Sequence, residues 1–140
     1  MSVFAVVDTN VLLSALLSKK DDTATVKILR AMMKGKFTPL WHDEIISEYA
    51  EVFHREKFHL QEASIQKVIL TIKTYGKYVF PATTSVAEAL IPIDLDDVIF
   101  WQVVMAERKN DAFLITGNIK HFPKCGFVLT PAQMIEMFDW

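Results

Sequence analysis

Residues 3–10 read Val-Phe-Ala-Val-Val-Asp-Thr-Asn, five apolar residues that end at a carboxylate. The run is short and rich in β-branched residues, and it lacks the alternation of a half-exposed strand. It therefore indicates a strand buried on both faces, as in a parallel sheet covered by helices. Asp8 would lie at the carboxyl end of this strand, where open α/β sheets bind their ligands. The alternative is that Asp8, Thr9 or Asn10 merely caps the apolar helix expected at 11–17.

The composition is that of an ordinary globular protein, and the 140 residues suffice for the single domain that we expect over 1–140. The net charge of −2 gives no strongly basic footprint for nucleic acid, although it does not report local clusters. No apolar run approaches the roughly 18 residues of a membrane span, and no basic segment precedes the first one, so we expect neither a membrane helix nor a signal peptide. The lone Cys125 cannot form an internal disulfide, which either suits a reducing, cytoplasmic compartment or carries no information.

Short apolar runs alternate with amphipathic segments along the chain. The strands are expected at 3–7, 37–41, 77–80, 112–116 and 127–129, and the helices at 11–17, 24–33, 43–54, 61–75, 98–108 and from 131 onward. This alternation predicts an α/β fold with a central parallel sheet of about four to five strands. Right-handed crossovers then bring all the strand carboxyl ends to one edge of the sheet.

The helix over 43–54 carries three glutamates at different angles from its apolar stripe. Glu48 lies roughly 100° from the centre of the stripe, whereas Glu44 and Glu51 lie about 140° and about 160° away, in solvent. Glu48 is therefore the acid best placed to reach inward, and replacing Glu51 should do little. The alternative is that Glu48 is an ordinary surface residue.

The helix expected over 98–108 is apolar almost all round, so it should be heavily buried. Asp97 shares a stripe with Trp101 and Val104. A carboxylate in that position is costly unless it meets a cation or strong donors. The alternative is that Asp94 caps the helix while Asp96 and Asp97 favour its dipole.

A further polar turn, Thr-Gly-Asn at 116–118, ends the strand over 112–116. Asp8, Glu48, Asp97 and Asn118 are therefore expected at one edge of the sheet. Several carboxylates repel one another unless a cation neutralises them. Because the chain has no His or Cys pair at zinc spacing, we expect Mg²⁺ or Mn²⁺, and such a site suits phosphoryl chemistry.

These motifs, in this order, resemble the PIN domain family, of the kind found in VapC-like toxins of bacterial toxin–antitoxin systems. The resemblance covers essentially the whole chain. It is carried by the strand that ends in Asp8-Thr-Asn, by the helix that opens Asp43-Glu-Ile-Ile-Ser-Glu-Tyr, by Asp94-Leu-Asp-Asp before the buried helix, and by Leu114-Ile-Thr-Gly-Asn.

The resemblance assigns the acidic metal ligands to Asp8, Glu48 and Asp97, with Asp96 as the alternative to Asp97. The family's fourth position is often Asp and here is Asn118, which can bind water or phosphate but adds no negative charge. Supporting roles in orienting ligands fall to Thr9, Asn10, Asp94 and Thr116. Many relatives have Ser where this chain has His42.

The resemblance further implies a three-layer α/β/α sandwich and a metal-dependent endoribonuclease that leaves a 5′-phosphate and a 3′-hydroxyl. It also implies a homodimer and a cognate antitoxin that covers the site. Arg55, Lys57 and Lys120 are the candidates for contact with RNA phosphates, and the alternative for each is a solvated surface position.

Other families with a strand that ends in Asp fit less well. A haloacid-dehalogenase-type phosphatase has a second Asp two residues later, where this chain has Asn10. A receiver domain has an acidic pair near the first strand and a late Lys, for which Lys120 is poorly placed. A dinucleotide-binding fold has a Gly-rich turn, and only four glycines are present. The remaining alternative is a PIN-fold binding module with little catalysis, which Asn118 and the net charge favour.

Overall fold

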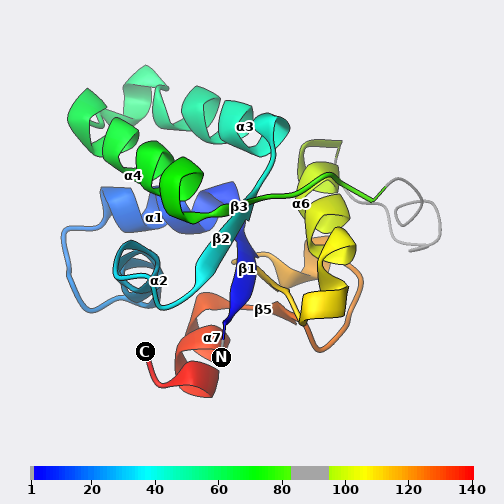
Figure 1. The fold of residues 1–140 in the computed structure, drawn as a ribbon. Helices are drawn as coiled ribbons and strands as arrows, with labels where there is room; N and C mark the ends of the chain where they lie inside the picture. The colour runs from blue at the N-terminus through cyan, green and yellow to red at the C-terminus, as the bar shows by residue number, and fades with distance from the viewer. Residues whose placement is uncertain (1, 83–94) are drawn as a thin grey trace.

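The structure, a computed structural model, describes residues 2–82 and 95–140. Its core is a sheet of five parallel strands in the order β3-β2-β1-β4-β5 (Figure 1). The strands are β1 (Phe4–Val7), β2 (Thr38–Trp41), β3 (Lys77–Tyr78), β4 (Phe113–Ile115) and β5 (Val128–Leu129). The predicted parallel sheet is confirmed, and each strand lies within its expected range.

Helices cover both faces of the sheet. They are α1 (Thr9–Leu17), α2 (Ala24–Met33), α3 (Asp43–Phe53), α4 (Glu62–Tyr75), α6 (Leu95–Ala106) and α7 (Pro131–Phe138), with 3₁₀ turns at Glu56–Phe58, Arg108–Asn110 and Ile119–His121. Figure 1 shows α1 and α2 on one side of the strands and α6 on the other, which confirms the predicted three-layer sandwich. Of the helices in the described residues, none combines the length and apolar character needed to span a membrane.

The first strand lies at the centre of the sheet, as its uniformly apolar sequence predicts. Ala5, Val6 and Val7 are buried, and β1 pairs with β2 on one side and β4 on the other. The backbone N–H of Asp8 continues this ladder by donating to the Ile115 carbonyl at 2.9 Å. The carboxylate of Asp8 is therefore fixed at the middle of the sheet's carboxyl edge.

The position of α3 follows from a cap and a buried hydroxyl. The His42 ring accepts the Glu44 N–H on Nδ1 at 3.2 Å, which is the role that Ser plays at many helix N-caps. Nearly two turns into the helix, the fully buried Tyr49 donates its hydroxyl to the carbonyl of Val7. The helix is thereby held against the end of β1, beside Asp8.

The helix α6 begins at Leu95, three residues before the predicted start at 98. Asp96 and Asp97 are accommodated in its first turn because carboxylates favour the positive end of the helix dipole. Asp94 lies outside the described residues. The rest of α6 is as apolar and buried as predicted, with Phe100 and Val104 fully enclosed.

An ion pair between a buried carboxylate and a partly exposed lysine ties the residue that follows α6 to the edge strand β3. Glu107 is 5% exposed and accepts hydrogen bonds from Lys77 Nζ at 3.0 Å and Asn110 Nδ2 at 2.8 Å. Burial alone would raise the pKa of this carboxyl, but the two donors outweigh burial and lower it. The pair fixes the far end of the helix whose first turn carries Asp97.

We expect Lys77→Met to destabilise the protein at pH 7 by about 1–2 kcal/mol, because it leaves a buried carboxylate with one donor fewer. Thermal unfolding would show this as a lower Tm. Since the folded pKa of Glu107 is lowered, the contribution of the pair is present above the unfolded pKa, about 4.3, and is lost as the pH falls through the folded value. The deficit of the variant should therefore shrink in acid.

Lys67→Met, at an exposed position on α4, is the matched control and should leave the Tm within about a degree of the wild type. Equal Tm values for Lys77→Met and wild type at pH 7 would show that Glu107 does not need its lysine.

Candidate active site

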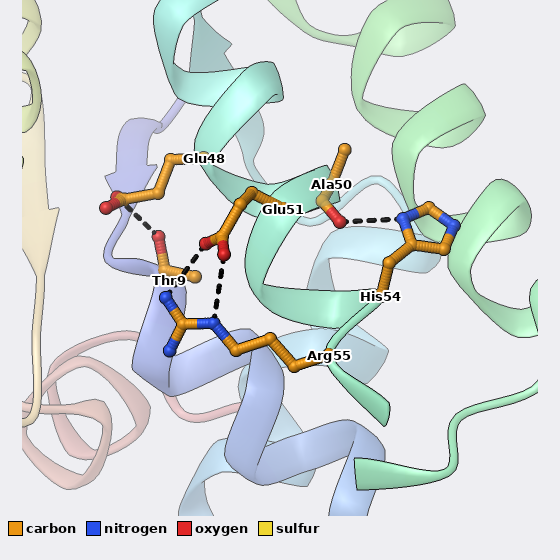
Figure 2. A network of polar contacts seen from close by, with 6 residues as sticks. All are labelled: Thr9, Glu48, Ala50, Glu51, His54 and Arg55. Atoms are coloured by element: carbon orange, nitrogen blue, oxygen red, sulfur yellow. Dashed lines mark hydrogen bonds and ion pairs between the residues drawn. The ribbon is translucent and has the colours of Figure 1, made fainter. Parts of the chain in front are cut away.

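Three elements bring acidic side chains to the carboxyl edge of the sheet. Asp8 follows β1, Glu48 lies on α3, and Asp97 lies in the first turn of α6. Two threonines hold the first two acids. Thr116 donates to Asp8 Oδ2 at 2.8 Å. Thr9 donates to Glu48 Oε2 at 2.9 Å, as Figure 2 shows. Thr9 and Glu48 are 39 positions apart in sequence, and Asp8 and Thr116 are 108 positions apart, so the fold brings distant residues into one site.

The carboxylate of Asp8 is buried, with 4% of the residue exposed. Asp8 is the N-cap residue of α1, but its side chain makes no capping hydrogen bond and accepts from Thr116 instead. Burial raises the pKa of Asp8, and the Thr116 hydroxyl and the charge of His121 offset this only in part. Capping therefore does not account for Asp8, and within the described parts of the chain the only cationic group that lowers its pKa is His121.

Glu48 is half-buried, as its position on the edge of the apolar stripe predicts. Burial raises its pKa, and the hydrogen bond from Thr9 lowers it again in part. The negative charges of Asp8, Asp96 and Asp97 raise it further. The four acids are therefore close enough to repel one another, which is the condition that a bound cation would relieve.

Asp97 and Asp96 differ in how they face the site. The Asp97 side chain is 18% exposed and pairs with His121, whose Nδ1 lies 3.6 Å from Oδ2. Asp96 is exposed and lines a pocket of about 190 Å³ together with Glu44 and Glu48. The structure thus gives Asp97 the inward position. The role of His121 was not foreseen from sequence, although its place three residues after Asn118, beyond the end of β4, was a usable signal.

The turn after β4 is organised by Thr116, which is fully buried. Its hydroxyl donates to Asp8 and accepts the Asn118 backbone N–H at 3.0 Å. Asn118 itself is exposed, and among the described residues its side-chain amide has no hydrogen-bond partner. Asn10 is exposed at the start of α1. These two amides can therefore contact a ligand or water at the same edge.

Of the three basic candidates, Arg55 is close enough to the acids for their charges to shift its pKa. Arg55 follows α3, Lys57 lies in the next 3₁₀ turn, and Lys120 lies in the 3₁₀ turn after Asn118, and all three are exposed. Among the described residues Lys57 contacts none of the acids. By contrast, Arg55 interacts electrostatically with Glu48 and Asp96, and His121 does so with Asp8.

The donor set of the site suits a hard divalent cation. Carboxylate, hydroxyl and amide oxygens converge without a cysteine, and oxygen is the ligand that Mg²⁺ and Mn²⁺ prefer. Within residues 2–82 and 95–140, however, no three His, Cys, Asp or Glu side chains are close enough to enclose an ion directly. These residues do not form a closed metal cage, and a divalent cation bound among them would have to keep part of its water shell.

Comparison with known proteins agrees with this architecture. A search of solved structures finds the crystal structure of VapBC2 from Rickettsia felis bound to a DNA fragment from their promoter, with a TM-score of 0.53 and 14% sequence identity. The match covers 91% of this chain and 97% of that one, and it shows a shared fold. No curated protein sequence matches. The family model described as PIN domain matches residues 5–120, so the chain belongs to the PIN domain family.

Proposed function

We propose that the protein is a metal-dependent endoribonuclease that hydrolyses RNA phosphodiester bonds and acts as the toxin of a toxin–antitoxin pair. The observation that carries this proposal is the convergence of Asp8, Glu48 and Asp97 from three separate elements. Burial raises the pKa of Asp8, burial and the neighbouring acids raise the pKa of Glu48, and among the described residues no lysine or arginine is paired with Asp8. Membership of the PIN family supports a nuclease.

In this proposal Asp8, Glu48 and Asp97 hold Mg²⁺ or Mn²⁺, partly through water, with Asp96 as the alternative to Asp97. A divalent ion bound there would polarise a phosphate oxygen and lower the pKa of a water ligand. Thr116 keeps the Asp8 carboxylate in place, and Thr9 does the same for Glu48.

The substrate contacts follow from the groups around the acids. The side-chain amides of Asn118 and Asn10 are exposed and have no hydrogen-bond partner among the described residues, so they would be able to orient a water or a phosphate oxygen. Arg55, Lys57 and Lys120 would contact the RNA backbone, where each neutralised phosphate releases counterions and strengthens binding.

The proposed partners are a cognate antitoxin and a second copy of the chain. The shared fold with VapBC2 supports the first, and both follow from the resemblance to VapC-like toxins. A cytoplasmic location belongs to the same proposal.

A second candidate function is a PIN-fold binding module without catalysis. The exposed amide of Asn118, the net charge of −2 and the lack of a closed metal cage among the described residues favour it. Such a module would bind RNA or protein equally well with chelator, and it would not need all three acids.

We expect the purified protein to cut a mixed RNA pool with Mn²⁺ or Mg²⁺ and not with chelator. Asp8→Asn and Asp97→Ala should each reduce the cleavage rate by roughly 10³-fold, because each removes a ligand charge. Glu136→Ala, at an exposed position on α7, is the control and should cut like the wild type. Normal cleavage by Asp97→Ala would show that the site is wrongly assigned, and no cleavage under any metal would favour the binding module.

A second prediction concerns stability rather than activity. In chelator at pH 7, Asp8→Asn should raise the Tm by on the order of 3 °C, because it removes a buried charge while its amide oxygen can still accept from Thr116. Since the pKa of Asp8 is raised in the folded protein, its ionised form is destabilising, and that penalty disappears as the pH falls through the folded pKa. The gain of the variant should therefore shrink towards pH 4 in this assay.

Added Mn²⁺ should reverse the order of stability, because an ion that binds only the folded wild type raises its Tm by mass action. The Asp8→Asn protein should respond weakly. An equal response of both proteins to Mn²⁺ would place the ion elsewhere.

A further inference from the structure

Arg55, the second residue after α3, is held in a fixed orientation by Glu51. Its Nε donates to Glu51 Oε1 at 3.1 Å, and a terminal nitrogen donates to Oε2 at 2.8 Å (Figure 2). Two parallel hydrogen bonds to one carboxylate fix the plane of the guanidinium as well as its position. The guanidinium of Arg55 is therefore already oriented before any ligand binds, although the side chain is 46% exposed.

This pair faces the candidate active site. Glu48, Glu51 and Arg55 are spaced by three and four residues, which places them on one side of α3. In Figure 2 they extend towards the side on which Thr9 lies, whereas His54 extends the opposite way, towards α4, where it meets Glu62. The guanidinium lies beside Glu51, and Glu51 is three residues, less than one helical turn, from Glu48, the acid that Thr9 holds.

Electrostatics agree with this placement. The hydrogen bond and the charge of Glu51 raise the pKa of Arg55, and the charges of Glu48 and Asp96 raise it further. Arg55 is therefore within electrostatic reach of the acids on both α3 and α6. His121 lies beside Asp97 at another part of the same cluster.

The bonds to Glu51 leave part of the guanidinium free. A guanidinium has five N–H groups, of which Glu51 takes two. Among the described residues no second acceptor contacts Arg55. The edge formed by the two terminal nitrogens is planar and can donate bidentate hydrogen bonds to two oxygens of a phosphate.

We propose that Arg55, oriented by Glu51, binds a phosphate of the RNA backbone beside the acid cluster. This inference rests on the proposed ribonuclease function, since RNA is the polyanion that must approach Asp8, Glu48 and the α6 acids. The fixed positive charge of Arg55 beside the acid cluster offsets the repulsion that the acids exert on an incoming RNA strand. Glu51 acts as a positioning residue, because it contacts Arg55 and not the RNA.

This role for Glu51 departs from the expectation that its replacement does little, and it predicts an effect of unusual sign. Removing an exposed negative charge should by general electrostatics strengthen the binding of RNA. If Glu51 orients Arg55, its removal should weaken binding instead. The sign of the change therefore separates positioning from simple charge.

The test is binding of fluorescently labelled, random-sequence single-stranded RNA over a series of salt concentrations, with every variant made in the non-cleaving Asp8→Asn protein. Arg55→Ala should raise Kd roughly tenfold and reduce the salt slope by about 0.7, as expected for one lost phosphate contact. Arg55→Lys should restore the slope but only part of the affinity, since it keeps the charge without the fork. Glu51→Ala should also weaken binding.

The matched controls are Arg30→Ala, which removes an exposed arginine bound to the Asp21 carbonyl, and Glu62→Ala, which removes an exposed acid paired with His54. Arg30→Ala should leave the affinity near that of the parent, and Glu62→Ala should leave it unchanged or slightly tighter. Binding by Arg55→Ala equal to that by Arg30→Ala would overturn the inference. Tighter binding by Glu51→Ala would overturn the positioning role.

Cleavage separates this inference from the function on which it rests. In the otherwise unaltered protein, Arg55→Ala should raise KM with little change in kcat, the pattern of lost uniform binding. If the unaltered protein cuts no RNA with any metal but Arg55→Ala still loses RNA affinity, the nuclease proposal fails and the phosphate site stands. If the unaltered protein cuts and Arg55→Ala binds and cuts like it, the phosphate site alone fails.

Discussion

The structure depends on a carboxylate held at the centre of a parallel sheet. Asp8 directly follows the innermost strand, its backbone N–H donates to the Ile115 carbonyl on β4, and the residue is 4% exposed. A group in this position cannot retreat into solvent, and the Thr116 hydroxyl on the neighbouring strand supplies a hydrogen bond but no charge. Burying the charge of Asp8 therefore costs part of the free energy of folding and leaves an acid in a fixed position, as is common at functional sites.

The surrounding elements are arranged so that other acids reach the same point. Tyr49 links α3 to the last carbonyl of β1, and Thr9 links the start of α1 to Glu48. Both contacts join the residues that flank Asp8 to a single helix. A shift of α3 would therefore break a buried hydrogen bond, which is costly in a low-dielectric interior. Glu48 is held near Asp8 although the two charges repel.

Much of this could be predicted from sequence because burial leaves a pattern in the residues. The uniformly apolar β1 and α6 and the angle of Glu48 on α3 each follow from periodicity. The start of α6 could not be fixed, since acids are as acceptable inside a first turn as before it. Periodicity also records Tyr49 as apolar and so misses the hydroxyl that anchors the helix.

The polar contacts that complete the site could not be predicted from sequence, because they depend on which side chains the fold brings together. His121 meets Asp97 across 24 residues, and only the turn after β4 decides that they meet. Sequence left Asp96 and Asp97 as alternatives, because a one-residue step of about 100° matters only once the neighbours are known. The capping role of His42 could not be predicted from sequence and follows only from the hydrogen bond that its ring accepts from the Glu44 N–H.

Net charge says little about whether such a site can receive RNA. The −2 of the whole chain includes the acids at the sheet edge, which belong to the metal in the proposed function. What a strand of RNA would meet locally is that edge with a cation bound, Arg55 beyond α3 and His121 beyond β4. Coulomb interactions fall with distance and with salt, so groups within a Debye length, about 8 Å, outweigh the sum over the surface. A chain that is acidic overall can therefore bind a polyanion, provided that its acids are neutralised where the polyanion lies.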